Sequence, residues 1–419
     1  MSEKSTRRRA PLRTLLVSLA VLAIATPLVF KLFEPVFVYT SGWSPMPREI
    51  AFPAQQAVYD ERYVAQARAA QTALEAARRH MDTPALSAAV AIDGELIWAS
   101  AIGFADLEAR RPVDVNSRFR LGSTSKAVTA IAVGTLLDRG LLDLDAQIQT
   151  YVPSYPMQRW PISVRQVMSH RAGVRDYGLC FCFPVWEHQN RRRFPNVNAA
   201  IDVIAQSPLL FEPGTNFAYT SLGYNLVGAA IEGATDAPFG QYLDEAVFNP
   251  LAMTGTGLDS VPGAEVDRVA FYEVEDGRYK RAFHVDNSIR WPSGGLLSTP
   301  SDMVRLGGAL LDDRLLSENT RRALVTVPAG GEGARGAQYY ALGWRTGEWT
   351  LFEGAVSTLA YHHGGTAVGG TSIFVVFPEH RMVVSTMMNK GGTNADDLAV
   401  ATDQIVQAFI PFNDEQSGD

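Results

Sequence analysis

Stretches with β-strand character occur near both ends of this chain, while helical patterns fill the region between them. Near the amino end, residues 88–92 and 95–100 flank Asp93-Gly94, a pair that favours a two-residue hairpin turn. Near the other end, β-branched and aromatic residues are frequent in four stretches, namely 339–347, 357–362, 371–377 and 381–388. We therefore expect an α+β fold in which one antiparallel sheet is built from both chain ends.

Helices account for much of the remaining chain. Helical patterns extend over 59–81, 127–137, 163–169, 222–231, 301–311 and 396–409. Residues 174–198 are irregular and aromatic instead, which is typical of a functional loop. This order predicts helices flanking the sheet and a mostly helical subdomain inserted between its two groups of strands.

An apolar segment lies close to the amino terminus. Residues 15–33 contain few polar side chains and follow four arginines between positions 7 and 13. The segment is long enough to span a bilayer, and the arginines favour a cytoplasmic amino terminus. A cleaved signal peptide is the alternative, because Ala23-Ile24-Ala25 resembles a cleavage site. Apolar residues continue to Tyr39, so we favour one uncleaved transmembrane helix.

The expected organisation follows from these features. It comprises a cytoplasmic basic tail (1–14), a transmembrane anchor (15–33), a linker (34–58), a main domain (59–412) and a short tail (413–419). The charge bias predicts a single-pass protein of the inner (cytoplasmic) membrane, with the main domain in the periplasm or an equivalent exterior space. The formal net charge is −7 although the amino terminus is basic. The main domain is therefore acidic, which argues against nucleic acid as a partner.

The two cysteines, Cys180 and Cys182, stand one residue apart. A disulfide across so short a loop has poor geometry, so we interpret them as small apolar residues. A metal site with His170 or His188 is the alternative, but neither a metal nor another cofactor is expected. We interpret His170 as a structural residue that braces its loop.

Ser123 and Lys126 form the first candidate catalytic pair. They stand three residues apart at the start of a helical stretch, so the hydroxyl and the amine share one helix face. Gly122 permits a sharp turn before the helix. An acyl-transfer nucleophile needs this combination of a hydroxyl, a nearby base and backbone donors. The alternative is a capping serine beside a solvated lysine.

Two later segments complete the chemistry. Tyr219 lies in a turn that enters a helix, where a nearby cation would favour its phenolate and allow it to relay protons. The run His362-His363-Gly364-Gly365 ends a predicted strand. The amides of Ser123 and Gly365 are candidates for an oxyanion hole.

These motifs together resemble a known family, the serine β-lactamases and penicillin-binding-like hydrolases related to class C β-lactamases. Within it, the chain is most similar to the branch of the mitochondrial serine β-lactamase-like protein and its bacterial relatives. The resemblance runs from about residue 84 to 409. Besides Ser-x-x-Lys, it rests on ordered segments, namely Gly140–Asp145, Tyr151–Pro153, Val164–His170, Glu212–Gly214, Gly294–Thr299 and His362–Gly365.

The resemblance implies a role for each matching residue. Ser123 matches the acylated nucleophile, Lys126 the adjacent base and Tyr219 the tyrosine of the second motif. His362 matches the first position of the third motif and Gly364 its third position. His363 takes the first position if the strand register shifts by one. Ser221, His363 and Gly364 are the expected substrate-binding residues.

Two departures from the family pattern affect the expected activity. Ser221 stands where the family usually has Asn, and His362 stands where true β-lactamases have Lys. A mostly neutral histidine is a weaker partner for a carboxylate than lysine. The resemblance therefore implies a membrane-anchored peptidase or esterase that acts on a small-molecule or peptide substrate through a Ser123 acyl-enzyme. The alternatives are a true β-lactamase and a catalytically silent binding or assembly protein; the sequence leaves the oligomeric state open.

Overall fold

The central sheet joins the two ends of the chain, as predicted. The computed structural model describes residues 9–48, 50–178, 186–259, 267–328, 339–392 and 395–410. Within these residues the sheet has nine strands, in the order β11-β12-β13-β14-β15-β3-β4-β2, with β5 paired to β4. Strand β15 from the carboxyl end pairs with β3 from the amino end, opposing Val384 to Val90. All pairs in this sheet are antiparallel.

The bounds of β14 and β15 agree with the predicted stretches to within one residue, whereas β3 begins earlier and β4 and β13 extend five or six residues further than predicted. The strands are β2 (Ala54–Val58), β3 (Ala85–Ile92), β4 (Glu95–Asp106), β5 (Arg111–Pro112), β11 (Tyr339–Tyr340), β12 (Arg345–Leu351), β13 (Val356–Ala367), β14 (Gly370–Phe377) and β15 (Met382–Met388). Asp93 and Gly94 form the hairpin turn between β3 and β4. Both have positive φ angles, of 52° and 80°, which two-residue hairpin turns of this kind require.

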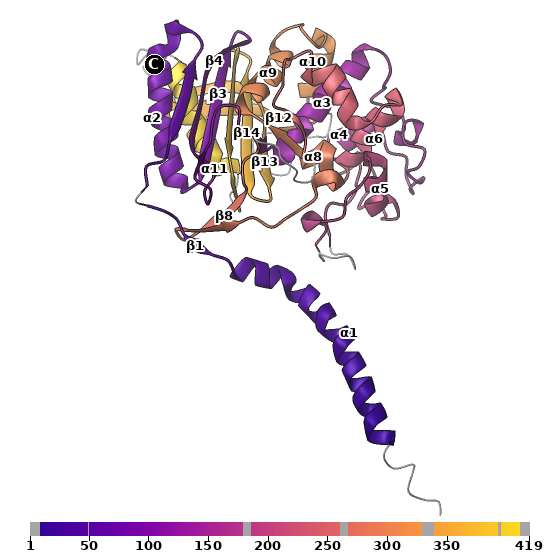
Figure 1. Ribbon diagram of the computed structural model, residues 1–419. Coiled ribbons are helices and arrows are strands. Elements are labelled where there is room, and N and C mark those ends of the chain that lie inside the picture. The colour runs from indigo at the N-terminus through magenta and orange to yellow at the C-terminus, as the bar shows by residue number, and fades with distance from the viewer. Residues whose placement is uncertain are drawn as a thin grey trace, which may run out of the picture.

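Helices cover both faces of the sheet (Figure 1). Helices α2 (Val64–Met81) and α11 (Ala395–Phe409) pack on one face, and α9 (Pro300–Leu311) packs on the other. The strands supply alternating residues to two separate cores. On β3, for example, Ala88 and Val90 belong to the core beneath α2 and α11, whereas Ala89 and Ala91 belong to the core beneath the other helices.

The inserted region is mostly helical, as expected. Its helices are α3 (Ser125–Asp138), α4 (Val164–Met168), α5 (Val197–Ala205), α6 (Tyr224–Thr235), α7 (Phe239–Leu243), α8 (Trp291–Gly294) and α10 (Glu318–Val325). Ser163 and Gln166 cap α4 with a reciprocal pair of hydrogen bonds. Thr299 caps α9. Cys180 and Cys182 lie outside the described residues.

Two smaller sheets border this body. One has the order β6-β10-β7, and the other has the order β1-β9-β8-β16. Their strands are β1 (Ser44–Pro45), β6 (Phe119–Arg120), β7 (Gly257–Leu258), β8 (Tyr272–Glu275), β9 (Arg278–Arg281), β10 (Leu296–Ser298) and β16 (Lys390–Gly391). The segment expected as a linker, 34–58, thus contains β1 and also β2, which is an edge strand of the central sheet. Much of that segment therefore belongs to the folded body.

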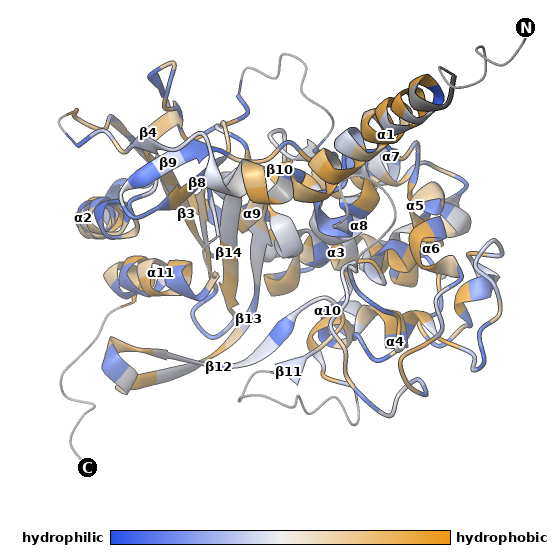
Figure 2. Cartoon of the chain, turned by 90° about the horizontal axis from the view of Figure 1, so that it is seen from below, coloured by the Kyte–Doolittle hydropathy of each residue, from blue (hydrophilic) through white to orange (hydrophobic). Residues whose placement is uncertain are grey.

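A long apolar helix, α1 (Arg9–Thr40), projects from the body. Its residues Leu12–Glu34 have a mean hydropathy of 2.3, and none of that stretch is buried in the protein. Figure 2 shows the apolar colour along much of α1, whereas the helices of the body mix apolar and polar residues. A helix that is apolar all round suits a membrane span or a signal sequence rather than an aqueous surface.

Candidate active site

Ser123 lies in a tight 3₁₀ turn, Gly122–Thr124, that leads directly into α3. Gly122 has a φ angle of +53°, and a Cβ there would lie 2.7–2.8 Å from backbone atoms of Thr366 on β13. Only glycine fits this position, because it tolerates both the angle and the close approach. The turn therefore packs the backbone beside Ser123 directly against β13 at Thr366.

The amine of Lys126 lies within reach of the Ser123 hydroxyl. Lys126 is fully buried, and its Nζ donates to Ser123 Oγ at 3.2 Å, to Ser221 Oγ at 3.2 Å and to the Ser293 carbonyl at 2.9 Å. Its three N–H donors thus have protein acceptors. The one-turn spacing predicted from the sequence brings the two groups together where the 3₁₀ turn passes into α3.

Burial makes Lys126 a weak base that suits proton transfer near neutral pH. Desolvation lowers the pKa of its amine to about 7; Asp176 partly opposes this shift, while Arg290 and Arg345 add to it. A neutral amine can accept a proton, whereas an ordinary lysine is charged at pH 7. The pair therefore has the geometry and the electrostatics of an activated serine.

Tyr219 reaches the same pair from the loop before α6. Its hydroxyl bonds to Ser123, and Lys126 Nζ lies 4.7 Å from the centre of its ring. Burial nevertheless raises the pKa of Tyr219. The expected stabilisation of the phenolate is therefore wrong, because desolvation outweighs the neighbouring charges. Tyr219 is a protonated phenol that can donate.

His170 contacts the loop that carries Tyr219 through its ring and its backbone. Its ring lies 4.2 Å from that of Tyr219, centre to centre, and its Nδ1 accepts a hydrogen bond from the Thr220 amide. Its carbonyl accepts another from the Ala218 amide. These contacts agree with the structural role assigned from the sequence.

Ser221 takes part in the Lys126 network through its side chain and its backbone. Its Oγ accepts from Lys126, and its amide donates to Asp176 Oδ1 at 2.8 Å. The amide of Leu222 donates to the same oxygen. Ser221 thus provides an oxygen acceptor for the lysine at the position where the family usually has Asn.

The two histidines of the third motif face opposite sides of β13. His363 pairs with Phe374 of one core, whereas His362 pairs with Val375 of the other, and directly opposed residues share a face. His363 lies 6.4 Å from Tyr219, ring centre to ring centre. The ring of His362 packs edge-on against Trp349 instead. His363 is therefore the histidine that joins Ser123, Lys126 and Tyr219.

Hydrogen bonds hold His363 in one neutral form. Its Nδ1 lies 2.7 Å from the Gly364 carbonyl, which can only accept, so Nδ1 carries the proton. Its Nε2 then accepts from the Tyr340 hydroxyl at 3.0 Å. Burial and the charge of Lys126 lower the pKa of His363 well below its usual value.

The glycines after His363 let β13 approach the nucleophile turn. A Cβ on Gly365 would lie 1.9 Å from the Leu121 carbonyl and 2.9 Å from the Thr124 amide. A Cβ on Gly364 would point instead toward Ala395, at the start of α11. Gly365 is therefore packed against the Ser123 turn, which is the location required of the second oxyanion donor.

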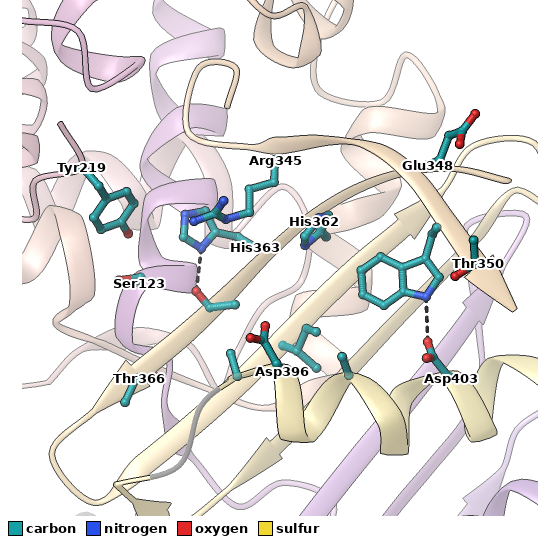
Figure 3. A pocket seen from close by; sticks show the side chains of 15 residues that line it. Ser123, Tyr219, Arg345, Glu348, Thr350, His362, His363, Thr366, Asp396 and Asp403 are labelled. Carbon is teal, nitrogen blue, oxygen red and sulfur yellow. Dashed lines mark hydrogen bonds between the residues drawn. The ribbon is translucent and has the colours of Figure 1, made fainter. Parts of the chain in front are cut away.

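A cavity of about 640 Å³ opens beside Ser123. Figure 3 shows Ser123, Tyr219 and His363 at one end, with Arg345 close to them. Asp403 lies at the other end, where it accepts a hydrogen bond from Trp349 Nε1 at 2.6 Å. No group of three or more His, Cys, Asp or Glu side chains suited to a metal occurs among the described residues.

Four residues of the site were not found from the sequence. Asp176, Ser293 and Tyr340 act through contacts with distant segments, and Arg345 lines the cavity from the neighbouring strand. None belongs to a local pattern with a chemical meaning. Arg345 was predicted to lie in a strand, but only the register that pairs it with His362 places it at the cavity.

Comparison with known proteins agrees with this geometry. The family described as Beta-lactamase matches residues 73–408. The human protein named serine beta-lactamase-like protein LACTB, mitochondrial, is 25% identical over 389 residues, covering 73% of this chain and 71% of that protein. Esterase EstB of Burkholderia gladioli is 31% identical over 194 residues, covering 44% of this chain and 48% of the esterase.

The solved structures show the same fold. D-amino acid amidase from Ochrobactrum anthropi SV3 superposes with a TM-score of 0.68 at 21% identity, covering 82% of this chain and 98% of the amidase. The sheet joined from both ends, the Ser123–Lys126–Tyr219 cluster and the family match over most of the chain lead to one conclusion. This chain belongs to the β-lactamase family and is a serine hydrolase of the β-lactamase fold.

Proposed function

We propose that the chain hydrolyses an ester or amide through an acyl-enzyme on Ser123. The observation that carries this proposal is the buried amine of Lys126, which lies 3.2 Å from Ser123 Oγ and has a pKa of about 7. Neutral Lys126 takes the hydroxyl proton as Oγ attacks the substrate carbonyl. The amides of Ser123 and Gly365 would hold the resulting oxyanion.

The same groups account for the remaining proton transfers. Tyr219 bonds to Ser123 and lies against the Lys126 amine, so its phenol can pass a proton to the leaving alcohol or amine and be reprotonated by Lys126. In the second half, a water attacks the Ser123 ester while the lysine–tyrosine pair accepts its proton. Ser123 Oγ then regains its proton and the acid product leaves.

Labelling tests the proposal directly. A fluorophosphonate probe should modify the full chain at Ser123, and the Ser123→Ala variant should lose this label. Ser125→Ala is the matched control, because Ser125 is a buried neighbour whose Oγ accepts from the Leu296 amide. Equal labelling of intact Ser123→Ala protein would show that another residue is the nucleophile. A folded wild-type chain without labelling or turnover would instead favour the silent binding or assembly protein.

An esterase or peptidase fits the site better than a dedicated β-lactamase. The third motif contributes a neutral histidine, His363, where a true β-lactamase has a charged lysine. The carboxylate of a bound penicillin would therefore have no lysine cation from this motif as its partner. We expect slow turnover of a nitrocefin-type substrate compared with simple esters. Hydrolysis of nitrocefin faster than any ester or D-amino-acid peptide in a panel would reverse this order.

We further propose that α1 anchors the protein in the inner membrane, with the body in the periplasm or an equivalent exterior space. Its apolar stretch, Leu12–Glu34, spans 23 residues, which at 1.5 Å per residue is long enough for the hydrocarbon core. Alkaline carbonate washing should leave the protein in the membrane pellet with an intact amino terminus. Release of a chain beginning at Thr26 would show a cleaved signal peptide instead.

A further inference from the structure

Asp176 lies in the loop after α4, and its carboxylate binds the turn that leads from Tyr219 into α6. Its Oδ1 accepts hydrogen bonds from the amide of Ser221 at 2.8 Å and from the amide of Leu222 at 3.3 Å. A carboxylate is a strong partner for such amides, because it is charged and lies near the positive end of the helix dipole. Asp176 therefore fixes the backbone of Ser221.

The same serine contacts the catalytic lysine. Ser221 Oγ accepts from Lys126 Nζ at 3.2 Å, while the Ser221 amide donates to Asp176. One residue thus connects the carboxylate of Asp176 to the amine of Lys126. The place of the Ser221 hydroxyl beside that amine depends on where Asp176 holds the Ser221 backbone.

The loop that carries Asp176 is itself held on two sides. The Arg175 guanidinium donates to Glu187 Oε2 at 2.7 Å, to the Val203 carbonyl at 2.6 Å and to the Asp176 carbonyl at 2.9 Å. On the other side, the Thr220 hydroxyl donates to the Arg175 carbonyl at 2.8 Å. The carboxylate of Asp176 therefore projects from a fixed backbone, as a positioning group requires.

The groups around Lys126 differ in charge. Those that face it come from several elements, namely Asp176 and His170 from the loop after α4, Tyr177 from the same loop, Tyr219 and Tyr224 beside and on α6, Arg290 before α8, Arg345 on β12 and His363 on β13. Burial keeps the histidines and the tyrosines neutral. Both arginines repel the protonated amine, whereas the carboxylate of Asp176 attracts it.

From this arrangement we infer that Asp176 is a positioning residue for the reaction, which holds Ser221 against the Lys126 amine and supplies the negative charge that keeps this amine an effective base. Asp176 is not among the residues that line the cavity, so it acts through Ser221 and Lys126 rather than on the substrate. The inference rests on the proposed function for its kinetic consequence. The pH range in which Lys126 is neutral then depends on Asp176.

The Asp176→Asn variant tests the charge. Asn keeps an oxygen for the two amides but carries no charge, so the protonated form of Lys126 becomes less stable and its pKa falls. On a p-nitrophenyl ester, with the full chain in detergent, the pH at which kcat/KM reaches half of its plateau should move about one unit below the wild-type value. Asp114→Asn is the matched control, because Asp114 is also partly buried and its Oδ1 accepts the Asn116 amide in another loop.

The Asp176→Ala variant tests the positioning. It removes the charge and also the acceptor of the two amides, so the plateau of kcat/KM should fall about tenfold below that of Asp176→Asn. An unchanged half-plateau pH in Asp176→Asn, or equal plateaus in the two variants, would overturn the inference. Asp176→Asn is nearly isosteric, so its pH profile decides the matter even where Asp176→Ala does not fold.

A titration that needs no turnover separates this inference from the catalytic proposal. The chain has five lysines, so ¹³C at lysine Cε gives few NMR signals, and the signal of Lys126 is the one lost in Lys126→Met. Its midpoint should lie near pH 7 in the wild type and about one unit lower in Asp176→Asn. This shift without any hydrolysis would contradict only the proposed function. Equal midpoints in the two chains would contradict the role of Asp176, even if hydrolysis is fast.

Discussion

His362 and His363 are neighbours in the sequence, yet the two faces of β13 give them different tasks. His363 lies beside Lys126 and Tyr219, with both ring nitrogens hydrogen-bonded. His362 lies on the other face, where its ring packs edge-on against Trp349, and its Nε2 has no partner among the described residues. Burial keeps both rings neutral. One strand thus separates a preorganised catalytic face from a face that is polar but unsatisfied.

The comparison shows how a β-strand can serve chemistry and recognition together. Because side chains alternate, residues on one face position the reacting groups while those on the other shape the cavity beyond them. Full hydrogen bonding holds His363 rigid, which catalysis requires. His362 is instead held mainly by packing, because its buried Nε2 has no partner among the described residues and its ring lies against Trp349. The following predictions test this division, beginning with the largest effect.

Replacing Lys126 should abolish most of the activity. Lys126→Met keeps much of the side-chain volume but removes the base next to Ser123, so kcat/KM should fall about 10³-fold, within the range for a general base. Lys390→Met is the control, since Lys390 bonds the Met81 carbonyl at another location. A Lys126→Met enzyme with more than a tenth of wild-type kcat/KM would place the base elsewhere.

The pH profile should report Lys126 and neither histidine. The folded pKa of Lys126 is lowered to about 7, so the amine is protonated and inactive as a base below that pH. We therefore expect kcat/KM to fall about tenfold per pH unit below pH 7 and to level off above it. Both histidine pKa values lie below the usual range. An inflection near pH 6 that disappears in His363→Gln would contradict this assignment.

The histidines themselves should differ in which kinetic constant they affect. His363→Ala removes a ring packed against Tyr219 and Tyr340, so kcat on a neutral ester should fall by about 10- to 100-fold through misplacement of the catalytic groups. His362→Ala removes a ring that lines the cavity and packs against Trp349, so it should instead raise KM for the same ester more than it lowers kcat. Equal losses of kcat in the two variants would show that the faces of β13 are not separate in function.

Much of the fold was predictable because local signals and the tertiary structure agree. Asp93-Gly94 set the β3–β4 turn, and strand composition marked β13, β14 and β15. The Ser123–Lys126 pair also follows from helical spacing alone. The segment 34–58 was harder, because short edge strands such as β1 and β2 carry little apolar alternation and depend on their partner strands.

The register of the third motif could not be decided from the sequence. Both His362 and His363 are buried, since β13 is covered on both faces, and so alternation of polar and apolar residues is lost there. The prediction that Tyr219 has a lowered pKa was wrong for a related reason. Sequence shows the nearby charge but not the burial, which raises the pKa more than the charge lowers it.

The smallest predicted effect concerns Tyr340, whose hydroxyl is hydrogen-bonded to His363 Nε2. Tyr340→Phe keeps the ring but removes the hydroxyl that donates to His363 Nε2 at 3.0 Å. The bond from Nδ1 to the Gly364 carbonyl remains, so the tautomer should persist and kcat should fall only about two- to fivefold, as expected for one neutral hydrogen bond. KM should stay as in the wild type.

Tyr339→Phe provides the control for this last variant, because Tyr339 is the neighbouring, exposed residue of β11. Steady-state kinetics of both variants on a neutral p-nitrophenyl ester would measure the difference. A Tyr340→Phe enzyme whose KM rises as much as that of His362→Ala would mean that the two faces of β13 are coupled. In that case, removing a bond on the catalytic face would move His362 through the shared backbone, and the division between the faces would be one of position only.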